Sequence, residues 1–112
     1  MRHSYTVSQL QAALASSTAP QLLDVRRAPV FEQADELIAG AFWRDPEQIA
    51  DWSGGLDSQR PVVVYCVHGH QVSQGCARQL ADLGFDAAFL EGGIEAWRAA
   101  AGPMAAKSGT SA

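Results

Sequence analysis

The stretch that decides the fold runs from residue 62 to residue 75 and reads VVVYCVHGHQVSQG. Its four leading β-formers, residues 62–65, predict a strand buried on both faces. The strand ends on Cys66, and a short loop containing Gly69 leads into a helical pattern from Ser73. In open α/β sheets, sites form beyond the carboxyl ends of the strands. Cys66 is therefore predicted to lie where such a site would form.

The loop after Cys66 has the composition of an anion-binding turn. In a strand–loop–helix connection, several backbone N–H groups and the helix N-terminus converge on one point, which favours an anion at the cysteine sulfur. The thiolate is the reactive form of cysteine, so we predict that Cys66 is a nucleophile. Cys76 lies on the apolar side of the helical pattern and is predicted to pack in the core.

Two histidines in the loop raise the question of a metal site. His68 and His70 follow Cys66 at i+2 and i+4, which offers three ligands for a borderline metal ion. However, a tight loop whose amides point inward turns its side chains outward, and a fourth ligand and a Cys-x-x-Cys pair are absent. We predict no metal and no cofactor. Two interpretations stay open for the histidines, namely solvated loop residues or residues of a pocket mouth.

Outward from this stretch, strands and helices alternate through short connections. Strands are predicted at 21–25, 38–43, 62–65 and 87–90, and helices from an N-cap at Ser8 to about 16, after Pro29, at 45–52, at 73–83 and at 94–101. This alternation is typical of an α/β domain with a parallel sheet. Residues 1–102 are predicted to form the domain, and residues 103–112 a flexible tail.

Composition excludes several classes of function. The 112 residues are 47% apolar and 18% charged, which indicates a globular protein of one domain. The net charge of −4 provides no basic surface for nucleic acid, so no nucleic-acid partner is expected. No segment approaches the ~20 apolar residues of a membrane span, and the first residues lack the apolar core of a signal peptide. We expect no membrane partner and a cytoplasmic location.

Three segments together resemble the single-domain rhodaneses, a family of sulfurtransferases. LLDVR at 22–26 is similar to the family's early Asp-Val-Arg strand, and VVVYC at 62–66 to its active-site strand and cysteine. LEGGIEAW at 90–97 is similar to the Gly-Gly turn before its last helix. The resemblance implies an α/β fold with three layers, α/β/α, around a five-stranded parallel sheet.

The resemblance also implies an enzyme activity, that of a thiosulfate or persulfide sulfurtransferase. Cys66 would take a sulfane sulfur from thiosulfate or a thiol persulfide, hold it as a persulfide, and pass it to a thiol or cyanide. The expected partners are small-molecule sulfur donors and acceptors or the thiol of a carrier protein. The loop amides would hold the persulfide charge. The implied substrate-binding residues are Val67, His68, Gly69, His70, Gln71 and Val72.

Three further residues are interpreted as structural support for the site. Asp24 is predicted to be a buried carboxylate at a strand end, and Arg26 to pair with Glu32 and fix the turn that follows. Active rhodaneses often carry an arginine or lysine in the loop where this chain has Val67 and Gln71, so we predict weak binding of the thiosulfate dianion. Arg44, in the next strand, is a candidate for a cation near the site.

The length of the loop leaves other activities open. If Ser73 is the serine that opens the helix, the loop from Cys66 through Val72 has seven residues, as in the related cell-cycle phosphatases and arsenate reductases. If Val72 takes that place, the extra residue lies inside the helix. A phosphatase-like or arsenate-reductase-like activity is thus one alternative, although those relatives grip phosphate with an arginine where this chain has Val72. A non-catalytic sensing or interaction module is another.

Overall fold

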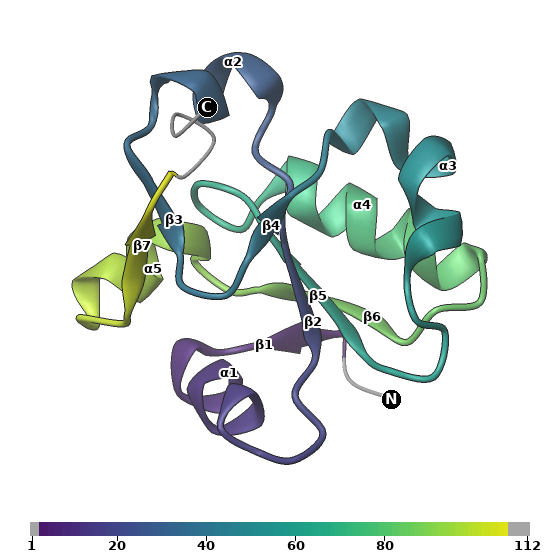
Figure 1. Cartoon of the computed structure of the whole chain (residues 1–112), viewed down its shortest axis with the longest axis horizontal. Helices are drawn as coiled ribbons and strands as arrows, with labels where there is room; N and C mark the ends of the chain where they lie inside the picture. Colours follow the sequence, from purple (N-terminus) through teal and green to yellow (C-terminus); the bar gives the residue numbers. More distant parts are fainter. Residues whose placement is uncertain (1–2, 108–112) are drawn as a thin grey trace.

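The predicted strand at residues 62–65 is β5 (Val62–Tyr65), the middle strand of a five-stranded parallel sheet. The computed structural model describes residues 3–107. The strand order is β1-β6-β5-β2-β4, with β1 (Ser4–Tyr5), β2 (Gln21–Asp24), β4 (Phe42–Trp43) and β6 (Ala87–Leu90) around β5 (Figure 1). The helices are α1 (Val7–Leu14), α2 (Ala28–Gln33), α3 (Ile49–Trp52), α4 (Gln71–Asp82) and α5 (Gly93–Ala99), with 3-10 turns η1 (Pro46–Gln48) and η2 (Ser53–Gly55).

Two apolar clusters, one on each face of the sheet, make the three layers. Successive side chains of a strand point to opposite faces, so Val62 and Val64 share one cluster with Leu80 of α4. Val63 and Tyr65 share the other cluster, whose helical members come from α1 and α5. The α/β/α fold with five parallel strands is therefore confirmed, and burial on both faces explains the apolar run of β5.

The prediction of one strand at 38–43 was wrong. Residues 36–38 form β3 (Glu36–Ile38), which pairs antiparallel with β7 (Met104–Ala106) outside the main sheet. Gly40 has a φ of 86°, a conformation that glycine adopts easily, and the chain turns there before entering β4. β7 also lies within the segment expected to be a flexible tail. Residues 108–112 of that segment lie outside the described residues.

The N-terminal part of the chain differs from the prediction in two details. Helix α1 is capped by Thr6 instead of Ser8, because the Thr6 hydroxyl accepts from the Gln9 N–H at 3.1 Å and the Gln9 side chain accepts from the Thr6 N–H at 2.9 Å. Residues 4–5 form β1, which was not predicted and pairs with β6. The Thr6 cap and strand β1 each involve only a few residues, too few to give a clear hydrophobic pattern in the sequence.

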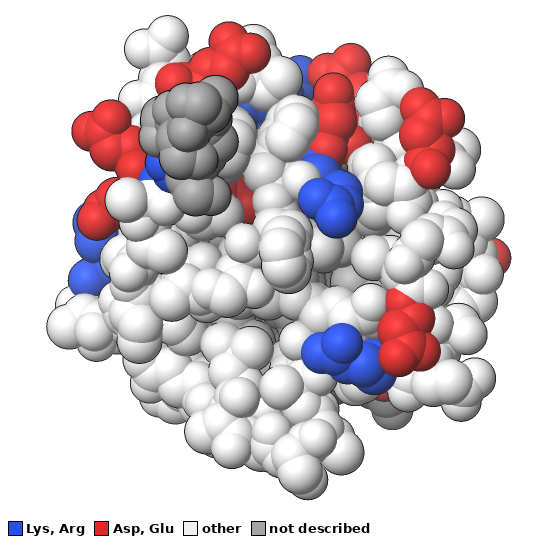
Figure 2. All heavy atoms as spheres, in the orientation of Figure 1, with Lys and Arg blue, Asp and Glu red and all other residues white. Residues whose placement is uncertain are grey.

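The distribution of surface charge and the character of the helices concern the expectations about nucleic-acid and membrane partners. On the face shown in Figure 2, basic side chains are scattered among acidic ones and form no continuous basic patch. Within residues 3–107, no helix has both the length and the apolar character that crossing a bilayer requires.

Candidate active site

Cys66 lies directly after β5, at the carboxyl edge of the sheet, and is 6% exposed. It forms part of a pocket of about 480 Å³ that opens between the loop and the segment after β2. The residues that line this pocket, here called the cysteine pocket, are Arg26, Arg27, Val30, Cys66, Val67, His68, His70, Gln71 and Val72. Five of the six implied substrate-binding residues are thus brought together around one sulfur.

The carbonyl groups of the loop are held on its outer side. At the start of α5, the N–H of Ile94 donates to the Cys66 carbonyl at 2.9 Å and the N–H of Glu95 to the Val67 carbonyl at 3.1 Å. The Gln74 side chain donates to the Gly69 carbonyl at 2.9 Å.

This arrangement directs loop amides away from those donors. The C=O and N–H of a trans peptide point in opposite directions, and the described chain has no cis peptides. The N–H groups of Val67 and His68 therefore point away from α5, and that of His70 away from the Gln74 side chain. In the part of the chain that the structure describes, none of the three donates to a backbone carbonyl. They remain available to an anion.

Two glycines let the loop and the Gly-Gly turn approach closely. Gly69 has a φ of 75°, and a Cβ there would lie 2.7 Å from the Gly92 nitrogen. Gly93 has a φ of 62°, and its Cβ would lie 2.4 Å from the Cys66 carbonyl oxygen. Gly69 therefore faces this turn and is absent from the pocket lining, unlike the other implied substrate-binding residues. The Gly-Gly motif fixes the shape of the loop.

Ser73 is the residue of α4 that contacts the sulfur. Its Oγ lies 3.1 Å from the Cys66 Sγ, and the residue is fully buried. Val72 instead packs against the core cluster that contains Val62 and Val64. Ser73 therefore takes the serine place beside the sulfur, whereas Gln71 and Val72, the last two of the seven residues from Cys66 to Val72, already belong to the helix. The helix itself begins earlier than predicted, at Gln71.

Cys76 is buried, as predicted from its place on the apolar side of the helix. It is 2% exposed and belongs to the core cluster on the α4 face of the sheet. Burial, and secondarily the neighbouring Cys66, raise the pKa of the Cys76 thiol to about 12. A thiol of this kind stays protonated and unreactive at neutral pH. Both cysteines are free thiols.

A buried ion pair supports the segment beside the cysteine pocket. Arg26 donates from Nη2 to the Asp24 carboxylate at 2.6 Å and from Nε to both carboxylate oxygens at 3.0 Å. The predicted pairing of Arg26 with Glu32 is therefore wrong. The carboxylate two residues away on the extended backbone is buried and within reach, whereas Glu32 is exposed. The Tyr65 hydroxyl donates to Asp24 at 3.2 Å, and burial, with the Asp24 charge, raises the Tyr65 pKa.

The cation at the site comes from a residue that sequence reasoning did not single out. Arg27 lines the cysteine pocket, whereas Arg44 is absent from it and stacks over Phe42 at 5.8 Å. Arg27 follows Arg26 at the carboxyl end of β2, the strand that pairs with β5. That adjacency was the available signal, because parallel strands that pair bring their carboxyl ends to one edge.

The two histidines lie at the mouth of the cysteine pocket. His68 and His70 are both exposed, and their ring centroids are 6.3 Å apart. Among residues 3–107, no three His, Cys, Asp or Glu side chains are grouped as a metal site requires. Both histidines line the cysteine pocket and are exposed to solvent, so their position fits both interpretations.

Comparison with known proteins identifies the family. A family model described as Rhodanese-like domain matches residues 6–100. The chain belongs to the rhodanese family. The three segments that resembled rhodaneses in the sequence lie together in the fold, because the loop after Cys66 contacts the Gly92–Gly93 turn and β5 pairs with β2.

Curated rhodanese relatives and solved structures cover most of the chain. A protein of Shewanella oneidensis named thiosulfate sulfurtransferase GlpE is 36% identical over 96 residues, which span 85% of this chain and 91% of that relative. A protein of the same name from Coxiella burnetii is 37% identical over 79 residues, 70% of this chain and 71% of the relative. The solved rhodanese-like domain of an Anabaena protein has a TM-score of 0.81 and 25% identity, covering 100% of this chain and 85% of that chain.

Proposed function

We propose that this protein is a sulfurtransferase that carries sulfane sulfur as a persulfide on Cys66. The observation that carries the proposal is the position of Cys66. It lines a pocket of about 480 Å³, and its sulfur contacts the Ser73 hydroxyl. The carbonyls of Cys66 and Val67 accept hydrogen bonds from the start of α5. Relatives named thiosulfate sulfurtransferase support the same chemistry. The donor is thiosulfate or a thiol persulfide, and the acceptor a thiol or cyanide.

The reaction consists of two displacements at sulfur. The Cys66 thiolate attacks the outer sulfur of thiosulfate, the S–S bond breaks, and sulfite leaves with the electron pair. With a thiol persulfide, the leaving group is the thiolate. An acceptor thiolate or cyanide then attacks the terminal sulfur of the Cys66 persulfide and releases the Cys66 thiolate. The N–H groups of Val67, His68 and His70, which donate to no backbone carbonyl in the described chain, would stabilise the persulfide anion, as donors do in an oxyanion hole.

Initial-rate kinetics test this proposal. With donor and cyanide varied together, we expect the parallel double-reciprocal lines of a ping-pong mechanism, because the first product leaves before the acceptor binds. Thiocyanate formation provides the readout. Intersecting lines would show that donor and acceptor must bind together and would contradict a free persulfide intermediate.

The Ser73 hydroxyl is expected to assist persulfide formation. In Ser73→Ala, we expect the single-turnover rate of sulfur uptake from thiosulfate to fall by at least about tenfold, since a hydrogen bond to a charged group contributes ~1.5–3 kcal/mol. Urea unfolding of the variant serves as the control for a purely structural effect. An uptake rate within about twofold of wild type would rule out this role.

One observation favours the phosphatase-like alternative, namely the seven-residue span from Cys66 to Val72. Val72 packs into the core and offers no donor to a phosphate, so the clamp that phosphoryl chemistry needs is missing there. An aryl phosphate assayed beside thiosulfate separates the two functions. Hydrolysis that disappears in Cys66→Ser, without sulfur transfer, would replace the proposed function with this alternative.

A further inference from the structure

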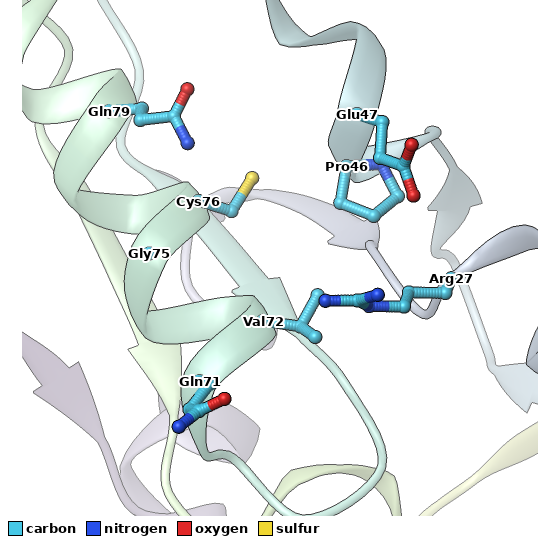
Figure 3. Close-up of a pocket in the computed structure, with 8 residues that line it drawn as sticks. All are labelled: Arg27, Pro46, Glu47, Gln71, Val72, Gly75, Cys76 and Gln79. Atoms are coloured by element: carbon cyan, nitrogen blue, oxygen red, sulfur yellow. The ribbon is translucent and has the colours of Figure 1, made fainter.

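A second, smaller pocket adjoins the cysteine pocket. It has a volume of about 170 Å³ and shares Arg27, Gln71 and Val72 with its neighbour. Its other lining residues are Pro46, Glu47, Gly75, Cys76 and Gln79. Figure 3 shows the side chains of α4 on one wall and those of Arg27, Pro46 and Glu47 opposite. The shared residues place the two pockets side by side, with Arg27, Gln71 and Val72 between the small pocket and the cysteine pocket.

Arg27 provides a cation at the junction of the two pockets. Its side chain extends from the segment after β2 to the side of Val72 (Figure 3). The peptide that precedes it is held, because the Trp43 Nε1 donates to the Arg26 carbonyl at 2.8 Å. Within residues 3–107, the Arg27 guanidinium has neither an ion pair nor a hydrogen bond. Its charge is available to a ligand.

Glu47 provides an anion on the same wall. It lies in η1, where its N–H donates to the Asp45 carboxylate at 2.9 Å, and it lines the small pocket beside Pro46 (Figure 3). Arg27 and Glu47 form no ion pair, although both line the pocket. Two opposite charges that share a pocket without neutralising each other suit a ligand that carries both charges.

The remaining polar groups and the size fit the same ligand. Gln71 and Gln79 of α4 add amide donors and acceptors to the wall opposite the charges. A volume of about 170 Å³ equals that of roughly six water molecules at ~30 Å³ each, enough for the α-carbon with its amino and carboxylate groups. The ligand must also carry sulfur, because the adjoining cysteine pocket contains Cys66.

We propose that the small pocket binds the α-amino-acid end of a small thiol or its persulfide, with Arg27 on the carboxylate and Glu47 on the ammonium group. This inference rests on the proposed function and specifies its substrate class. Cysteine and glutathione persulfides share this chemistry and differ in the distance from sulfur to the zwitterionic end. Thiosulfate, which has only negative charge, uses Arg27 alone.

Substrates that carry one charge each test the assignment. We compare the persulfides of cysteine and glutathione with those of mercaptopropionate, which has only a carboxylate, and cysteamine, which has only an ammonium group. Arg27→Gln is expected to raise KM about fivefold for every carboxylate-bearing donor and to leave that of cysteamine persulfide unraised. Glu47→Gln is expected to raise KM about fivefold for every ammonium-bearing donor and to leave that of mercaptopropionate persulfide unraised. The fivefold change in KM corresponds to the loss of ~1 kcal/mol, the contribution of an exposed ion pair.

Turnover should change little in either variant, because these contacts bind the ground state and the transition state equally. Matched controls are Arg78→Gln and Glu32→Gln, exposed residues that line neither pocket and are expected to keep the wild-type KM. An unchanged KM in Arg27→Gln and Glu47→Gln with active enzyme would overturn the inference. An effect of Arg27→Gln without one of Glu47→Gln would also overturn it and leave a plain anion site.

Binding without reaction separates this inference from the proposed function. S-methylcysteine and S-methylglutathione have no transferable sulfur, and calorimetric titration measures their binding to the wild-type protein. We expect one of them to bind, about fivefold more weakly to Arg27→Gln and to Glu47→Gln. The difference between the two ligands identifies the preferred length. Binding of neither would contradict the subsite even if sulfur transfer is observed, and binding without transfer would contradict only the proposed function.

Discussion

Cys66→Ser is expected to lower sulfur transfer from thiosulfate to cyanide by about 10³-fold or more, because it removes the atom that forms the covalent intermediate. A serine hydroxyl is similar in size to the thiol and preserves the contact partner of Ser73, so the loop should keep its shape. Thiocyanate formation under saturating donor provides the measurement, and urea unfolding checks that the variant is folded.

The other cysteine provides the control for this prediction. Cys76→Ala keeps Cys66, and because Cys76 is a core thiol with a raised pKa, we expect most of the transfer activity to remain while stability falls. If transfer survived in Cys66→Ser and was lost in Cys76→Ala, the sulfur carrier would be Cys76, which would contradict our assignment of Cys66.

Asp24→Ala is expected to cause the largest loss of stability, about 3–5 kcal/mol in the free energy of unfolding. Removing the carboxylate leaves the Arg26 guanidinium charged in a residue that is only 4% exposed, and it deprives the Tyr65 hydroxyl of its acceptor. Urea unfolding at neutral pH measures the change. Replacing both partners, in Asp24→Ala with Arg26→Met, should recover part of the loss because no buried charge remains.

The exposed pair of Arg98 and Glu36 is the matched control. Their side chains are about equally exposed, at 45% and 44%, and the distance is 3.0 Å. Glu36→Gln should therefore cost no more than ~1 kcal/mol. If Asp24→Ala were as mild as Glu36→Gln, the ion pair would not be what holds the wall of the cysteine pocket.

The parts of the fold that could be predicted are those with a local signal. The run at 62–65 consists of β-formers only and ends at a loop, so Cys66 could be placed at the edge of the sheet. The stretch 38–43 has β-formers at both ends, but Ile38 belongs to β3, which pairs with β7, and Phe42 and Trp43 form β4, which pairs with β2. Propensity does not specify a partner, so that division was missed.

The site was predictable to the same extent. Cys66 and most of its loop could be assigned from the strand–loop–helix pattern, whereas the contact of Ser73 with the sulfur depends on how α4 packs against β5. Arg26 has both Asp24 and Glu32 within a few residues, and only the burial of the first decides between them. Arg27 became visible as a site residue once β2 and β5 were seen to pair.

The central claim is that Cys66 carries the sulfur, and intact-protein mass spectrometry tests it most directly. After incubation with thiosulfate or glutathione persulfide and removal of the donor, wild-type protein should gain the mass of one sulfur atom, and cyanide should remove it. Cys66→Ala treated in the same way should gain nothing. No gain on the wild-type protein with either donor, or an equal gain on Cys66→Ala, would contradict the account.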